Sequence, residues 1–236
     1  SVFERGFPLQ AAEAVLDLKA CADPPWAVDV VHSLVDKSFV RPRSDARFDM
    51  LVSVQEYAAE HLNAPGHYTG SGPDGAIAAQ VRHGCYFGRP VQAATAAGAG
   101  SDLENIVAAC RRAVTRDDGE LAVNLLEHAW GGLKLQGPYQ VAADLASRVL
   151  EMSQPLADVK ARAHWVAGNA MHHGGHDAQA YAQFEAAVVL SRECGPQLGE
   201  AHAQRIRGDL DMGAGSANSA RSRFRAAMSV ARGLGD

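Results

Sequence analysis

Apolar residues recur at helical spacing along most of the chain, and this pattern predicts a mainly α protein. The segment 26–37 is a clear example, with apolar side chains at 28, 31, 34 and 35. Further helices are predicted at 8–16, 54–62, 76–97 with a bend near 88–90, 101–115, and 120–134. Two short apolar runs, 38–41 and 47–51, flank a polar turn and predict a β-hairpin. We expect this hairpin to be the only β structure.

One pattern is written twice in the second half of the chain. Four small residues and one phenylalanine occur again 40 positions later. The first set is Gly168, Ala180, Phe184, Ala187 and Gly195, and the second is Gly208, Ala220, Phe224, Ala227 and Gly235. A weaker copy begins at Gly137, where Ala146 replaces the phenylalanine and Val149 the second alanine. A fixed period of this length indicates a repeat architecture, in which stacked units share a continuous core.

The repeat skeleton resembles the tetratricopeptide repeat. Its small residues let two antiparallel helices approach closely, and the phenylalanine fills the space between them. The family's usual Trp, Leu and Tyr are replaced by His164, Ala167 and Met171. The resemblance implies a right-handed α-solenoid that is part of a longer array. We expect Phe184 and Phe224 to occupy equivalent buried positions.

The first half of the chain resembles a second family. The matching segments are 1–3, 6–7, 9–15, 34–40, 54–62 and, for the connecting segment, 102–105. They are similar to the winged-helix region of signal-transduction ATPases with numerous domains (STAND regulators). In these bacterial proteins a nucleotide-binding domain precedes the winged helix, and tetratricopeptide-like repeats follow it. The resemblance implies a winged helix over 1–65, a linker and connecting helix over 66–100, and helical repeats over 101–236.

Composition and charge limit the classes of function. The formal net charge is −5, and residues 1–65 carry six Lys and Arg against ten Asp and Glu, a balance of −4. DNA binding by the winged helix is the alternative function. However, the expected recognition helix, 26–37, has one basic residue against two acidic ones, and Arg41, Arg43 and Arg47 on the hairpin form the only basic cluster. Nucleic acid is therefore not the expected partner. No apolar run is long enough to span a membrane. The four cysteines show no paired spacing, which favours a reducing cytoplasm.

The sequence offers little for catalysis. It contains no G-x-x-x-x-G-K-[ST] loop for phosphate, and Leu51 and Val52 stand where related regulators have a nucleotide-sensing His-Asp pair. We therefore expect no enzyme activity, no nucleotide turnover and no cofactor. His172, His173 and His176 could be interpreted as a zinc site, but an exposed turn between two helices is the simpler interpretation.

Binding is the better-supported function. In stacked tetratricopeptide units the first helix of each pair lines a concave groove, and the resemblance assigns these positions to Arg162, Trp165, Asn169, His172, His202, Arg205, Asp209 and Met212, with Asn124, Glu127 and Lys134 in the weak unit. We expect a non-enzymatic sensor or scaffold that binds a protein partner or signalling ligand in this groove and works with the nucleotide-binding domain of the same protein. The aromatic and cationic residues favour an acidic partner with apolar anchors. Alternatively, Trp165 packs only against its neighbouring helix.

Overall fold

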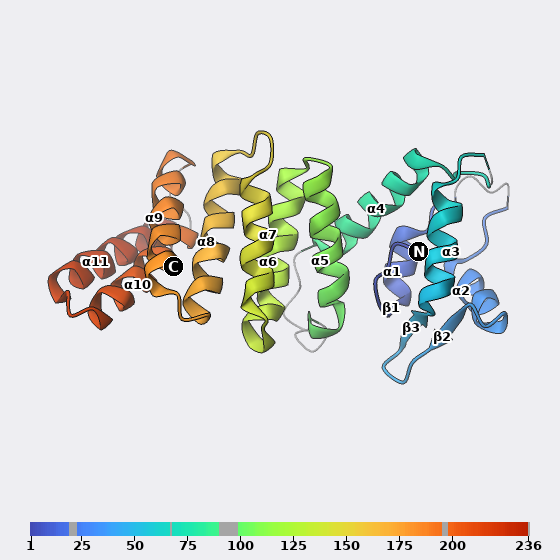
Figure 1. The fold of residues 1–236 in the computed structure, drawn as a ribbon, viewed down its shortest axis with the longest axis horizontal. Helices are drawn as coiled ribbons and strands as arrows, with labels where there is room; N and C mark the ends of the chain where they lie inside the picture. The colour runs from blue at the N-terminus through green and yellow to red at the C-terminus, as the bar shows by residue number, and fades with distance from the viewer. Residues whose placement is uncertain (19–22, 67, 90–98, 195–197, 236) are drawn as a thin grey trace. The chain divides into compact units, whose positions relative to one another are not determined.

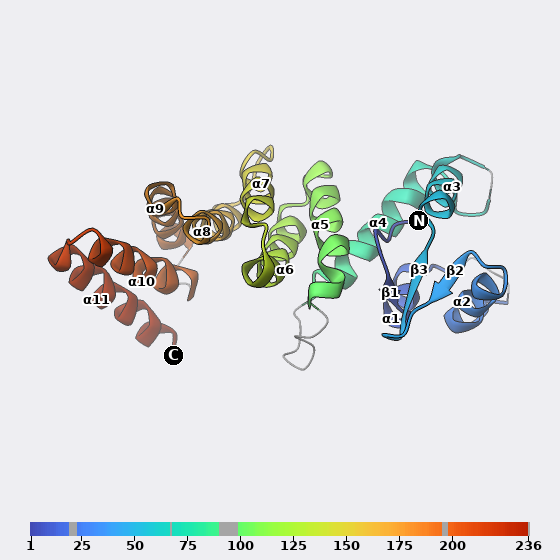
Figure 2. The ribbon, with the colours of Figure 1, turned by 60° about the horizontal axis from the view of Figure 1, so that its bottom comes forward.

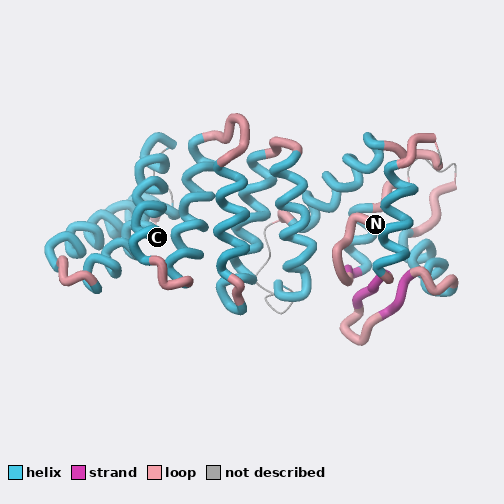
Figure 3. Tube along the Cα trace, viewed as in Figure 1, coloured by secondary structure: helices cyan, strands magenta, loops and turns pink. Residues whose placement is uncertain are grey.

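The computed structural model describes residues 1–18, 23–66, 68–89, 99–194 and 198–235. These residues are mainly helical, as the sequence predicts, and they contain one small sheet (Figure 3). The chain divides into two compact units, Ser1–Ala113 and Val114–Asp236. Figure 1 gives the labels of the elements in both.

The first unit combines the sheet with short helices. Its elements are β1 (Phe7–Pro8), α1 (Leu9–Val15), α2 (Ala27–Asp36), β2 (Val40–Pro42), β3 (Arg47–Met50), α3 (Val52–Asn63), α4 (Pro73–Phe87) and most of α5 (Ala99–Thr115). Strands β2 and β3 form the predicted antiparallel hairpin, with Val40 opposite Met50. Helix α1 packs on α2 and α4, and α3 also packs on α4.

One expectation about this unit is wrong, and one helix begins earlier than predicted. A third strand, β1, pairs with β3 and places Phe7 opposite Phe48, so the hairpin is not the only β structure. The helix predicted over 101–115 begins two residues earlier, because α5 starts at Ala99. Asp102 in its first turn accepts a hydrogen bond from Arg47 at 2.5 Å. Helix α4 ends at Phe87, and the bend expected near residue 90 falls partly outside the described residues.

The N-terminal segment is tied to α4 and α5 by a buried polar group. Asn105 accepts a hydrogen bond from the backbone N–H of Glu4 at 2.9 Å and donates one to the carbonyl of Gly6 at 3.3 Å. His83 lies 3.3 Å from the same amide oxygen and is fully buried against the ring of Phe3. His83 belongs to the segment predicted as a linker, and Asn105 belongs to the predicted repeats. Both segments therefore contact the N-terminal residues.

The second unit consists of helical hairpins. Its helices are α6 (Gly119–Gln136), α7 (Tyr139–Leu150), α8 (Ala157–His173), α9 (Asp177–Cys194), α10 (Leu198–Gly213) and α11 (Ala217–Leu234). Each packs on the next in sequence, and α6 also packs on α8. Figures 1 and 2 both show α10 and α11 side by side. Asp118 starts α6 by accepting a hydrogen bond from the N–H of Leu121 at 3.2 Å.

The 40-residue pattern corresponds to one repeated contact. A Cβ placed on Gly168 would lie 2.7 Å from the ring of Phe184, and a Cβ on Gly208 would lie 2.6 Å from the ring of Phe224. Only glycine leaves room for the ring at either position. The proposed register of the two copies is therefore confirmed within each hairpin.

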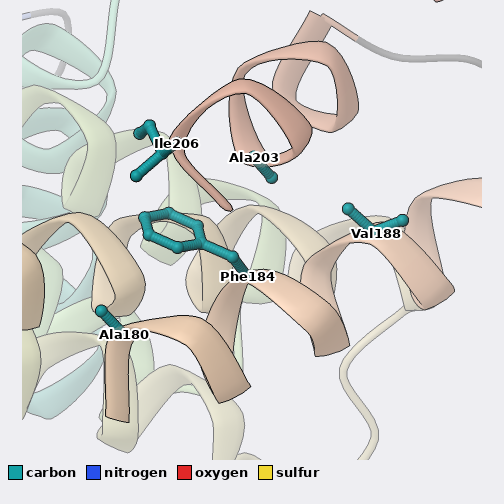
Figure 4. Close-up of a cluster of buried hydrophobic side chains, with 5 residues drawn as sticks. All are labelled: Ala180, Phe184, Val188, Ala203 and Ile206. Atoms are coloured by element: carbon teal, nitrogen blue, oxygen red, sulfur yellow. The ribbon is translucent and has the colours of Figure 1, made fainter. Parts of the chain in front are cut away.

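Burial of the two rings differs. Phe184 is fully buried under Ala203 and Ile206 of α10 (Figure 4). Phe224 is only half-buried, and the described residues contain no helix that covers it as α10 covers Phe184. The expectation of equal burial is wrong for this reason.

Candidate functional site

A pocket of about 300 Å³ lies within the second unit, where α6, α8, α9 and α10 meet. It has a largely apolar wall and a charged rim, and its lining residues are Glu127, Ala161, Arg162, Trp165, Ala187, Ser191, Gly199 and His202. Two small side chains, Ala161 of α8 and Ala187 of α9, line the pocket together with the indole of Trp165. A concave, mainly apolar space with a few polar groups is the usual form of a ligand site.

Arg162 is held by carboxylates from two helices. Its Nε and Nη2 donate to the two carboxylate oxygens of Glu127 at 3.1 and 2.6 Å. Glu120 and Asp158 add ion pairs at 3.3 and 3.6 Å. Burial disfavours the charged guanidinium, but the hydrogen bonds and charge of Glu127, with the charges of Glu120 and Asp158, outweigh burial and raise the pKa of Arg162 above its usual value.

The local charge is therefore opposite to the sequence-based expectation. One guanidinium stands among three carboxylates, which leaves a formal charge of −2 around Arg162. Arg205 is paired with Asp209 at 3.1 Å, so it adds no free positive charge to the same surface. The cationic groove that favoured an acidic partner is not present, because α6 supplies acids that compensate the arginine of α8.

Trp165 takes part in both the pocket and the core. Its indole lines the pocket and also packs on the buried cluster that contains Phe184 and Ile206. The indole N–H is buried and has no hydrogen-bond partner among the described residues. The ring of His202 lies 6.5 Å from the indole, measured between ring centroids. An unpaired N–H beside a pocket is available to a ligand that carries an acceptor.

The structure brings together three of the eight predicted groove residues, namely Arg162, Trp165 and His202. Asn169 is buried and donates to the carbonyl of Trp165 at 2.8 Å. His172 contacts Asp177 at 2.8 Å. Arg205, Asp209 and Met212 are exposed on α10 and do not line the pocket.

Sequence reasoning missed the acidic partners and the small wall residues. Asp158 and Arg162 are four residues apart, a spacing that indicates an ion pair on a helix. The sequence analysis assigned Glu127 to the groove of the weak unit, but it did not predict the contact of Glu127 with Arg162. No signal in a single sequence marks Ala161 and Ala187 as pocket walls rather than ordinary core.

Two of the three arginines of the β-hairpin, Arg43 and Arg47, are also compensated. Arg47 pairs with Asp102 at 2.5 Å, and Arg43 lies 3.4 Å from Asp45 and 3.8 Å from Asp49. They border a second pocket of about 640 Å³ in the first unit. This arrangement leaves few free cations for phosphate contacts.

Side-chain clusters of the metal-binding type and apolar helices of membrane-spanning length are both absent from the described part of the chain. It holds no cluster of three or more His, Cys, Asp or Glu side chains placed for a metal ion. His173 instead lies 2.9 Å from the carbonyl of Asn169. No described helix combines the length and apolar character needed to cross a membrane.

No protein-family model, curated protein or solved structure matches the chain.

Proposed function

We propose that this chain is the winged-helix and tetratricopeptide-like repeat region of a cytoplasmic STAND regulator, and that it works as a non-enzymatic sensor and scaffold. Two features support the proposal. The β2–β3 hairpin lies between α2 and α3, where a wing is expected, and the Gly–Phe contacts repeat with the 40-residue period. In such a protein the nucleotide-binding domain is a partner within the same polypeptide.

The observation that carries the binding function is the pocket that joins Arg162, Trp165 and His202. We propose that it accepts an apolar side chain with a cationic end, presented by a protein partner. The apolar part would contact the indole of Trp165 and the neighbouring alanines. The cationic end would lie near Glu127, where carboxylates outnumber guanidinium groups.

Peptide arrays test this proposal directly. One array presents a single aliphatic or aromatic residue flanked by arginine or lysine, and a matched array carries glutamate in the flanking positions. We expect purified protein to bind the basic array. The double variant Glu127→Gln with His202→Ala should lose most of this binding, because both side chains line the pocket.

Arg205→Ala is the matched control. Arg205 is exposed on the same helix as His202 but does not line the pocket, so this variant should bind like the wild type. Equal binding to the acidic array would show that the charge assignment is wrong. Absence of binding to both arrays would reject the pocket as a peptide site.

A further inference from the structure

Helix α11 carries positive charge that the rest of the second unit does not compensate. It contains four arginines and no acidic residue. Arg223 pairs with Asp211 at 2.7 Å. Arg221, Arg225 and Arg232 are exposed and form no ion pair within the described residues. Three free arginines on one helix favour a partner of opposite charge.

The acidic residues of the neighbouring helix are already engaged. On α10, Glu200 pairs with Arg192, and Asp209 pairs with Arg205. Asp211, the third acid of α10, holds Arg223 as described above. The free arginines of α11 therefore have no spare carboxylate on α10.

Apolar side chains lie between these arginines. Phe224 is half-buried, and Met228 is 53% exposed. Arg221, Phe224, Arg225 and Met228 follow one another at spacings of three, one and three residues, so they share one face of the helix. The exposed face of α11 is thus both apolar and basic.

Helix α9 is the counterpart of α11 in the preceding copy of the 40-residue pattern, and there the equivalent apolar face is covered by α10. Phe184 and Val188 are the counterparts of Phe224 and Met228, and both are buried, with exposures of 0% and 2%. They belong to the same buried cluster as Ala203 and Ile206 of α10 (Figure 4). The covering helix α10 therefore contacts this face through a small residue, Ala203, and an aliphatic residue, Ile206, three positions apart.

Ion pairs between α9 and α10 flank the apolar cluster on both sides. Glu185 of α9 accepts a hydrogen bond from Arg207 of α10 at 3.0 Å, and Arg192 pairs with Glu200 at 3.2 Å. One period later, Arg225 stands in place of Glu185, and Arg232 in place of Arg192. A helix that covers α11 in the same way needs an acid at both positions.

We propose that α11 docks an acidic amphipathic partner helix, packed as α10 packs on α9. The partner helix has an acid where α10 has Glu200, a small residue for Ala203, an aliphatic residue for Ile206, and a second acid for Arg207. Its two acids pair with Arg232 and Arg225, and its apolar residues cover Phe224 and Met228. α11 lines no part of the pocket described above, so this surface is independent of the proposed pocket ligand.

A peptide with the sequence of α10 can serve as the probe for this surface. A labelled peptide with the sequence of residues 198–213 and the change Arg207→Glu is compared with the unchanged peptide, both with the same staple to equalise helicity. We expect wild-type protein to bind the Arg207→Glu peptide about tenfold more tightly, because the unchanged peptide places arginine against Arg225. Protein with Arg225→Glu should show the reverse preference in the same anisotropy titration.

Arg205→Ala is the control variant and should leave both affinities unchanged, because Arg205 lies outside the pocket and outside α11. Arg221→Glu provides a second variant on α11 and should weaken the acidic peptide. Equal affinity for both peptides, no reversal in Arg225→Glu, or no binding of either peptide would overturn the proposal. Arginine-dependent binding to phosphatidylglycerol vesicles or to random duplex DNA, without binding of the peptide, would also overturn it and assign the face to that ligand.

Discussion

At the scale of single residues, two phenylalanines make the same contact in different surroundings. Phe184 and Phe224 fill the space over Gly168 and Gly208, but only Phe184 is covered by a following helix. We expect Phe184→Ala to lower the free energy of unfolding by about 3–5 kcal/mol, the usual range for a buried aromatic. Phe224→Ala should cost less, because part of its side chain already contacts water. Urea unfolding followed by circular dichroism measures both, and equal losses would contradict this explanation.

His83 links the pH to the stability of the first unit. Burial and then the charge of Arg112 lower its pKa from 6.5 to about 4, although the hydrogen bond with Asn105 acts in the opposite direction. Above about pH 6.5 the imidazole is neutral in both states, and its contribution to stability is complete. As the pH falls towards 4, the unfolded chain binds the proton first, so stability decreases by on the order of 3 kcal/mol.

The variant His83→Gln tests this origin, because glutamine can hydrogen-bond to Asn105 without titrating in this range. Its stability at neutral pH is expected to be lower than that of the wild type. Between pH 6.5 and 4 its stability should decrease less steeply in urea titrations. An equally steep decrease in both proteins would assign the acid sensitivity to other groups.

At the scale of elements, glycine sets the distance between the helices of a hairpin. A Cβ on Gly168 would meet the ring of Phe184 at 2.7 Å, whereas a Cβ on Gly131 in α6 would meet nothing within 4 Å. Gly168→Ala should therefore lower the melting temperature. Gly131→Ala should raise it, since alanine favours a helix over glycine by about 0.8–1 kcal/mol. A gain in stability for both variants would mean that the hairpin tolerates a wider spacing.

The sequence predicted elements better than the contacts between them. Periodicity placed the helices, and the spacing of small residues placed the Gly–Phe contacts. Strand β1 was missed because two residues cannot show an alternating pattern. The pairing of Asp102 with Arg47 was not predicted, because the two residues are 55 positions apart in sequence. The charge of the pocket was misassigned for the same reason, since Glu127 and Arg162 meet only after α6 and α8 pack together.

At the scale of the whole molecule, the two units have separate cores. Val2, Val15 and Ala79 form a buried cluster in the first unit, and the cluster around Phe184 belongs to the second. The buried His83 lies in the first unit, where a change of pH acts. A perturbation of one core should therefore change the unfolding of that unit.

Differential scanning calorimetry of the full chain tests this separation. We expect two transitions, because each unit buries its own apolar side chains and can unfold as a cooperative block. Phe184→Ala should lower the melting temperature of one transition and leave the other unchanged. A change from pH 7 to pH 5 should lower the transition that Phe184→Ala does not affect, and His83→Gln should reduce this pH effect. A single transition that moves with all three changes would show that the two cores unfold together, and the division into units would then not describe the stability of the protein.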